Sequence, residues 1–277
     1  MKRREAIVAG GLASLLPFTG LGAKFTSEAK NKASLKIGIA GYSFAYFKEN
    51  LDQVISIMQE VGVTHMTLKD FQLPFELTSE ETAKVISKLK SAGITPYGLG
   101  VIYMEKPEDV VRAFDYASRA GIDLIIGSPA EHLLPMVEDK VKSTGVRIAI
   151  HNHGPEDKRY PDIDSIYKAI EKLDTKVGIC LDVGHSYRCG HNPAEMLKRF
   201  GTRVIDMHIK DVTEPVAKGK STTPGRGQLD LQSVFQTAHE IGFSGFCSLE
   251  YERPGHPGMG IAESIGYMRG LIKTIQR

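Results

Sequence analysis

The chain has 277 residues, of which 42% are hydrophobic, and a formal net charge of +2. This length and apolar content suffice for one large α/β barrel or for two smaller domains. The charged side chains of residues 1–23 are Lys2, Arg3, Arg4 and Glu5, so these residues carry the whole excess of +2. A remainder with about zero net charge argues against a nucleic-acid partner bound through a basic face.

The N-terminal residues resemble an export signal. A basic segment at residues 2–4 precedes an apolar stretch at residues 6–18, which is too short for a comfortable membrane span. The paired arginines resemble a twin-arginine signal, and Gly22-Ala23 offers a cleavage site. We therefore expect residues 1–23 to be a signal peptide, residues 24–34 to be a linker, and the mature protein to be periplasmic or secreted. An amphipathic N-terminal helix is the alternative.

After residue 34, short apolar segments alternate with longer amphipathic ones. The short segments predict strands at Lys36–Phe44, His65–Lys69, Thr95–Val101, Asp123–Ser128, Arg147–His153, Val177–Asp182, Val204–Lys210 and Gly245–Glu250. Between them, apolar residues recur at i, i+3 and i+4 spacing, which predicts helices. These patterns cover residues 51–58, 85–89, 110–117, 133–137, 163–170, 196–200, 231–238 and 265–272.

Four of the predicted helices end in a similar way. Gly62, Gly93, Gly121 and Gly242 each stand where a residue just past a helix adopts the left-handed conformation. Eight strand–helix units give the count and length of a (β/α)8 TIM barrel, which would span residues 35–277. A doubly wound open sheet is the alternative, but the first strand carries no Gly-rich phosphate-binding fingerprint.

Four of the predicted strands end in imidazole and carboxylate side chains. The sequences are I-A-I-H-N-H-G-P-E at 148–156, G-I-C-L-D-V-G-H at 178–185, V-I-D-M-H-I-K-D at 204–211 and G-F-C-S-L-E-Y-E at 245–252. Strand carboxyl ends of a parallel barrel open on one face, so these side chains are expected to converge. A single histidine at a strand end is more often structural, but four such ends favour one site. Asp, Glu and imidazoles suit one divalent ion such as Mn, Co, Zn or Mg.

Such an ion polarises a carbonyl group and acidifies the adjacent C–H, so that a neighbouring carboxylate can remove the proton.

The roles of several other polar residues are ambiguous. Lys69-Asp70 either lines the barrel mouth or forms a surface pair, and Arg226 either touches a substrate oxygen or is solvated. Four further histidines are predicted to be solvated: His132, His191, His239 and His256. Two of them, His191 and His256, could also approach the barrel mouth.

The ordered set of strand-end motifs resembles the xylose isomerase-like TIM barrels, the sugar phosphate isomerase/epimerase family. That superfamily includes sugar isomerases, ketose 3-epimerases, inosose dehydratases and an endonuclease branch. Its sugar enzymes usually hold one divalent metal through Glu, Asp, His and Glu from strands five to eight. The resemblance implies Asp182, His208 and Glu250 as metal ligands, with His151 in place of the first Glu, as in branches with an H-N-H-x-x-E motif.

This replacement bears on the mechanism. In the ketose epimerases, two metal-binding glutamates act on opposite faces of the substrate carbon. Here the resemblance implies Glu250 as the base. Glu156 is the second catalytic carboxylate if it reaches the site. If it does not, we expect chemistry with a single base, such as aldose–ketose isomerisation or β-elimination from a keto-sugar. Lys210 or a histidine is expected to stabilise the enediolate, and His153 and His185 to contact the substrate.

We therefore expect a metal-dependent isomerase or epimerase that acts on a monosaccharide or a keto-sugar. The alternative is a lyase or hydratase that acts on 3-keto-glycosides or inosose-like keto-sugars. A non-catalytic sugar-binding barrel and an abasic-site endonuclease are weaker hypotheses. The expected partner is a small sugar, with no nucleic acid and, after signal removal, no membrane; a homo-oligomer is left open.

Overall fold

The computed structural model describes residues 34–47, 50–253 and 256–276. The predicted signal peptide, and the predicted linker up to residue 33, lie outside the described residues. A search of the described part of the chain finds no helix with the length and apolar character needed to cross a membrane.

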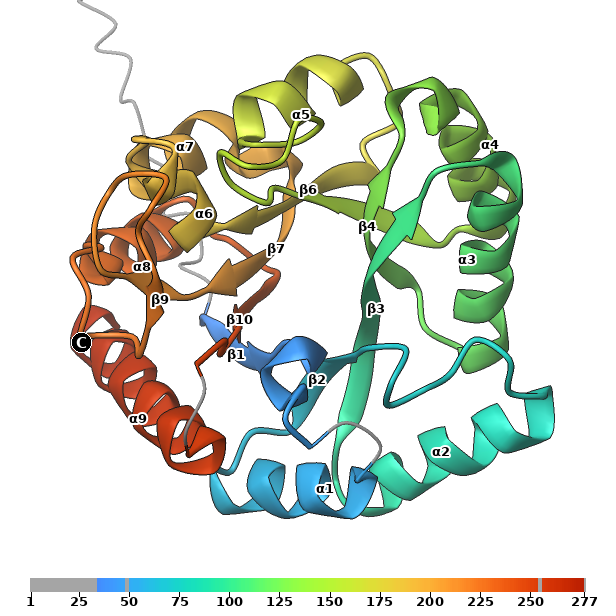
Figure 1. The fold of residues 1–277 in the computed structure, drawn as a ribbon, viewed down its shortest axis with the longest axis horizontal. Coiled ribbons are helices and arrows are strands. Elements are labelled where there is room, and N and C mark those ends of the chain that lie inside the picture. The colour runs from blue at the N-terminus through green and yellow to red at the C-terminus, as the bar shows by residue number, and fades with distance from the viewer. Residues whose placement is uncertain (1–33, 48–49, 254–255, 277) are drawn as a thin grey trace, which may run out of the picture. The chain divides into compact units, whose positions relative to one another are not determined.

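Eight parallel strands close into a barrel in the order β1, β10, β7, β6, β5, β4, β3, β2. Their bounds are β1 (Lys36–Ile39), β2 (His65–Leu68), β3 (Thr95–Met104), β4 (Leu124–Pro129), β5 (Arg147–His151), β6 (Val177–Asp182), β7 (Val204–Ile209) and β10 (Phe246–Leu249). Figure 1 shows the strands enclosed by a ring of helices. The predicted (β/α)8 TIM barrel is therefore confirmed.

The helices bury their apolar stripes against the outside of the barrel. They are α1 (Leu51–Glu60), α2 (Ser79–Ser91), α3 (Pro107–Ala120), α4 (Leu134–Thr144), α5 (Ile163–Ile170), α6 (Val183–Arg188), α7 (Pro193–Phe200), α8 (Leu231–Glu240) and α9 (Pro257–Ile275). The four predicted C-terminal glycines all have positive φ, at 63° for Gly62, 79° for Gly93, 64° for Gly121 and 71° for Gly242. A short antiparallel pair, β8 (Asp211–Val212) and β9 (Ser221–Thr222), follows β7.

The first strand is shorter than predicted, because residues 41–44 form the 3-10 helix η1 (Gly41–Phe44). The turn brings Gly41 against β2, where its N–H donates to Thr67 Oγ1 at 3.0 Å. A Cβ on Gly41 would lie only 2.8 Å from the Thr67 carbonyl oxygen, so this close approach requires glycine. The strand prediction failed here because an apolar sequence does not distinguish a buried strand from a buried turn.

The six-residue helix α6 was not predicted, since it is too short to show a helical period. It begins directly at the end of β6, where Asp182 Oδ1 accepts a hydrogen bond from His185 N at 2.7 Å. Gly184 lets Lys210 of the neighbouring strand end pack closely, since a Cβ there would lie 2.4 Å from Lys210 Cγ. This helix therefore positions both a predicted ligand and a predicted substrate-binding histidine.

Candidate metal centre

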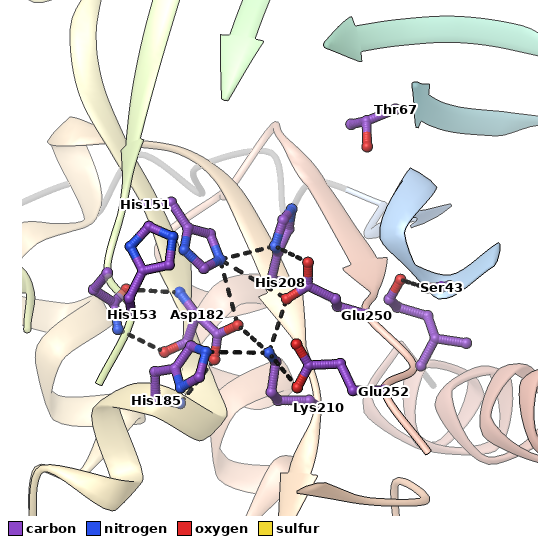
Figure 2. Close-up of polar contacts among 12 residues, drawn as sticks. Ser43, Thr67, His151, His153, Asp182, His185, His208, Lys210, Glu250 and Glu252 are labelled. Carbon is purple, nitrogen blue, oxygen red and sulfur yellow. Dashed lines mark hydrogen bonds and ion pairs between the residues drawn. The ribbon is translucent and has the colours of Figure 1, made fainter. Parts of the chain in front are cut away.

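Four buried side chains converge at the carboxyl end of the barrel (Figure 2). His151 ends β5, Asp182 ends β6, His208 lies near the end of β7, and Glu250 follows β10. One nitrogen or oxygen atom from each side chain lies within 4.8 Å of the corresponding atoms of the other three. The structure thus brings together the four residues that the sequence predicted as metal ligands.

The spacing of these atoms suits a small divalent ion. His151 Nε2 lies 3.0 Å from His208 Nδ1, 3.4 Å from Asp182 Oδ2 and 3.9 Å from Glu250 Oε2. His208 Nδ1 lies 3.2 Å from Glu250 Oε1. Ligand atoms about 2.0–2.2 Å from one tetrahedral ion would lie roughly 3.3–3.6 Å from one another. Asp182 Oδ2 is fully buried, and its contacts are the ion pairs with His151 and Lys210, so it is directed at the same point as the other ligand atoms. The residues present therefore fit a divalent metal.

Hydrogen bonds from neighbouring elements hold the backbone at two of the predicted ligands, Asp182 and Glu250. Asn152 lies fully buried between β5 and β6, where its Oδ1 accepts from Asp182 N at 2.9 Å and its Nδ2 donates to Asp182 O at 3.1 Å. Ser43 of η1 donates to Leu249 O at 2.9 Å and accepts from Tyr251 N at 2.9 Å, so it braces both sides of Glu250. Neither role could be read from the sequence, because both depend on which strands become neighbours.

Lys210 lies beneath the predicted ligands and contacts three carboxylates (Figure 2). Its Nζ is 3.0 Å from Asp182 Oδ2, 2.8 Å from Glu250 Oε2 and 3.0 Å from Glu252 Oε2. Burial would lower the pKa of Lys210, but the three carboxylates raise this pKa well above its usual value. The lysine therefore stays charged, and it favours the ionised forms of Asp182 and Glu250.

The carboxylates respond in the opposite direction. Burial alone would raise the pKa of Glu250, but His208 and Lys210 outweigh it and hold this pKa well below its usual value. Burial would also raise the pKa of Asp182, but His185, Lys210 and His151 together outweigh burial and depress this pKa. Burial instead dominates at Glu252 and raises its pKa. The two predicted ligands are therefore anionic at neutral pH.

Three of the four imidazoles around the site are neutral, whereas Cys180 and Glu250 outweigh burial at His208 and raise its pKa well above the usual value. Burial lowers the pKa of His151, lowers that of His153 to about 4, and lowers that of His185 to about 3. Neutral imidazole is the form that binds metals and that both donates and accepts hydrogen bonds. These three side chains can therefore serve as a ligand or as hydrogen-bonding groups for a bound molecule.

A cavity of about 220 Å³ opens above the candidate metal centre, and we call it the mouth cavity. Its lining includes three of the predicted site residues besides Glu250, namely His151, His153 and His185. Four further side chains complete the polar and aromatic lining: Tyr42, Lys69, Tyr103 and Glu252. The sequence left Lys69 ambiguous between the mouth and a surface pair; the structure places it in this lining, whereas no ion pair joins it to the exposed Asp70 among the described residues.

His153 and His185 have distinct partners around the mouth cavity. His153 Nε2 lies 2.9 Å from the Tyr103 hydroxyl, and its Nδ1 lies 3.2 Å from Asp157 Oδ2. His185 Nε2 lies 3.3 Å from Lys210 Nζ, and its Nδ1 lies 3.2 Å from Arg188 Nη1. Tyr103, Asp157 and Arg188 were not predicted. Asp157 lies four residues after His153 and Arg188 three residues after His185, so this spacing was a signal for both, whereas the contact of Tyr103 in β3 depends on the fold.

Two predicted site residues lie elsewhere. Glu156 forms an ion pair with Arg188, and its side chain is 61% exposed. Arg226 pairs with Glu263 of α9, and its side chain is 64% exposed. Neither residue lines the mouth cavity. Loop residues pair with whichever opposite charge the fold brings near them, and their sequence position does not specify that partner.

The remaining histidines follow the prediction with one exception. His132 and His256 are exposed, and His191 is partly buried with its Nε2 at 3.2 Å from Asp162 Oδ2. His239 is only 6% exposed, so its predicted solvation is wrong. It belongs to the last turn of α8, whose inner face packs on the barrel.

A second cavity, of about 400 Å³, lies at the opposite end of the barrel. Its lining includes Lys36, Thr95 and Phe246, at the amino ends of β1, β3 and β10. Clusters of possible metal-binding side chains found among the described residues all include His151 and His208, at the other end. In TIM barrels the carboxyl end of the strands carries the chemistry, so we take the mouth cavity as the candidate active site.

The comparisons with known proteins agree with this architecture. The family model described as xylose isomerase-like TIM barrel matches residues 42–271. The chain belongs to that family. The predicted resemblance is therefore confirmed at the level of the family.

The curated relatives that match include several proteins named inosose dehydratase. The protein from Lacticaseibacillus casei is 25% identical over 136 residues, which cover 43% of this chain and 45% of the relative. The protein from Clostridium botulinum is 28% identical over 125 residues, covering 39% of this chain and 41% of the relative. The matched region thus spans less than half the length of these relatives.

Solved structures share the fold at low identity. The zinc-bound IolI protein has a TM-score of 0.74 and 18% identity, covering 87% of this chain and 99% of that chain. The probable 3-DHS dehydratase AsbF of Bacillus anthracis has a TM-score of 0.69 and 11% identity, covering 85% of this chain and 99% of that chain. At these identities the likeness establishes the fold alone.

Proposed function

We propose that the protein is a divalent-metal-dependent lyase that removes water or an alcohol from a keto-sugar. The observation that carries this proposal is the asymmetry of the site. His151 stands where a second metal-binding carboxylate would serve two-face chemistry, and Glu156 is paired with Arg188 instead. The carboxylates that line the mouth cavity, Glu250 and Glu252, follow the same strand. The inosose dehydratase relatives support this lyase reading over our first expectation of an isomerase.

The chain's own residues supply most of the proposed chemistry. His151, Asp182, His208 and Glu250 would hold the ion, and a bound ion would polarise the substrate carbonyl and acidify the neighbouring C–H. Glu250 borders the mouth cavity and accepts that proton. Lys210 keeps Glu250 ionised before the transfer. Glu250 then passes this proton to the departing hydroxyl or alkoxide group as the C–O bond breaks, so that water or an alcohol leaves and the carboxylate is restored. His153 and His185, both neutral, bind substrate hydroxyl groups.

A metal-dependent isomerase or epimerase is the second candidate. It would share the first proton abstraction but must return a proton instead of expelling a leaving group. The observation that favours it is the Tyr103 hydroxyl, which is hydrogen-bonded to His153 and comes from β3, on another side of the mouth than Glu250. A phenol held in this way can donate a proton from a second direction.

One experiment separates the two reactions and tests the metal. The purified protein is analysed for bound ions, and its thermal unfolding is followed with added zinc, manganese or cobalt. A ligand at 100 times its Kd stabilises the folded state by about 2.7 kcal/mol. The loaded protein is then incubated with an inosose or a 3-keto-glycoside in deuterated buffer and followed by NMR. We expect loss of water or of the aglycone; C–H exchange without such loss would favour the isomerase, and absence of any bound ion would contradict both.

Export forms part of this proposal and rests on the sequence of residues 1–23 alone. An enzyme outside the cytoplasm would meet neutral or oxidised sugars more often than sugar phosphates. Mass spectrometry of the mature N-terminus from the native host's periplasmic fraction tests it. Recovery of an uncleaved N-terminus in the cytoplasm would contradict it.

A further inference from the structure

Two lysines lie at the barrel mouth, and their surroundings differ. Lys210 contacts Asp182, Glu250 and Glu252. Lys69, directly after β2, also lines the mouth cavity, but its Nζ donates to the Val101 carbonyl oxygen at 2.6 Å and forms no ion pair among the described residues. An ammonium group has three N–H donors, so one contact leaves donors for a bound molecule.

The position of Lys69 is fixed by the fold. Its backbone N–H donates to Gln72 Oε1 at 2.9 Å, while Gln72 Nε2 donates to Gly41 O at 3.2 Å. Gln72 is only 5% exposed, so this link between η1 and the end of β2 is shielded from water. The ammonium is therefore presented to the mouth cavity without further rearrangement, which lowers the entropic cost of binding.

No carboxylate of the described residues lies within ion-pair distance of the Lys69 ammonium, unlike the three that contact Lys210. Burial lowers the pKa of Lys69, and the attraction of Asp70 and Glu250 offsets only part of this effect. A bound anion in contact with the ammonium would favour its charged form and replace hydration that is lost on burial.

Lys69 also faces the metal ligands from across the barrel. In the closed strand order, β2 lies four strand positions from β6 in either direction, so Lys69 is opposite Asp182. The mouth cavity, at about 220 Å³, is smaller than the roughly 300–1,000 Å³ typical of pockets for drug-sized ligands. It suits one small molecule that reaches from the metal centre to Lys69.

We propose that Lys69 binds a substrate carboxylate, and that the substrate is a small keto acid whose carbonyl and carboxylate lie at opposite ends. This proposal rests on the proposed function, because it takes the mouth cavity as the substrate site. A carboxylate supplies one negative charge and two acceptor oxygens, which match the positive charge and the free donors of the ammonium. Specificity for an acid over a neutral sugar then resides in Lys69.

The test uses pairs of sugars that differ by one group. D-Fructuronate and D-tagaturonate carry a carboxylate where D-fructose and D-tagatose carry a terminal hydroxymethyl group. Their affinities for the zinc-loaded wild-type protein and for Lys69→Met and Lys69→Gln variants are measured by calorimetry. We expect at least one acid to bind the wild type about 10- to 100-fold more tightly than its neutral partner. Both variants should lose this preference while they keep their affinity for the neutral sugars.

The matched control is Lys84→Met, an exposed lysine of α2 that pairs with Glu80. It should keep the preference for the acid. Circular dichroism and zinc content establish that each variant is folded and loaded, and the two substitutions at position 69 guard against one that misfolds. Equal affinities within both pairs for the wild type, or a preference that survives in the folded Lys69 variants, would overturn the proposal. Either result leaves the proposed function standing, because zinc binding by the wild type is measured separately.

Discussion

The two sides of the barrel mouth differ in whether their charged side chains form ion pairs. The half formed by β5, β6, β7 and β10 carries the candidate ligands, and each of its carboxylates is paired with Lys210 or a histidine. The half formed by β1, β2 and β3 carries Tyr42, Lys69 and Tyr103, among which Lys69 has no carboxylate partner in the described chain. The comparison suggests that one half is built to hold an ion and the other to select what the ion acts on.

The largest expected effect is on catalysis in the ligand half. Glu250→Gln removes the proposed base but preserves the size of the side chain. We expect turnover of the keto-sugar to fall by about 100- to 10,000-fold with the fold intact. Product formation measured by NMR, with circular dichroism as the control, checks this, and near wild-type turnover would remove Glu250 from the role of base.

His151→Ala tests the unusual ligand. Loss of an outer partner of a metal ligand typically costs 10- to 100-fold in affinity, so loss of a ligand itself should cost at least about 100-fold. Competition with a chromophoric chelator measures zinc affinity directly. Unchanged affinity would assign the fourth ligand to another residue, of which His153 and Glu156 are the nearest in sequence.

The two lysines should differ in their contribution to stability. Lys210→Met leaves three buried or partly buried carboxylates without their cation, and we expect a loss of about 3–5 kcal/mol in the free energy of unfolding. Bound zinc should reduce this loss, because it replaces the missing positive charge. Lys69→Met removes no ion pair and should change stability by less than about 1 kcal/mol. Urea unfolding with zinc and with a chelator measures both, and equal losses would erase the contrast.

The smallest effect is expected at Glu156. Its ion pair with Arg188 is largely exposed, and such pairs contribute about 0–1 kcal/mol. Glu156→Gln should therefore leave turnover within about threefold of wild type, in keeping with a pair of this strength. A fall as large as that expected for Glu250→Gln would show that Glu156 reaches the substrate and would restore the two-carboxylate mechanism.

Much of the barrel could be predicted from periodicity. The strand bounds were right within one residue for β2, β4, β6, β7 and β10, because buried strands are short apolar runs flanked by polar turns. Predictions failed at η1 and α6, which are too short to show a period. His239 was misjudged because a polar residue at the end of an amphipathic helix can still face inward.

The family resemblance singled out His151, Asp182, His208 and Glu250 as one ligand set. The sequence by itself determined which side chains end the strands, and hence that these side chains would converge. The reason is that parallel strands in a closed barrel place their carboxyl ends on one rim. The tertiary structure decided the partner of each charge at that rim. Lys69 and Lys210 both stand at strand ends, but only Lys210 is placed beside β6 and β10, whose carboxylates compensate it. Such pairing depends on which strands lie next to each other and on side-chain direction, neither of which a residue's position along the chain specifies.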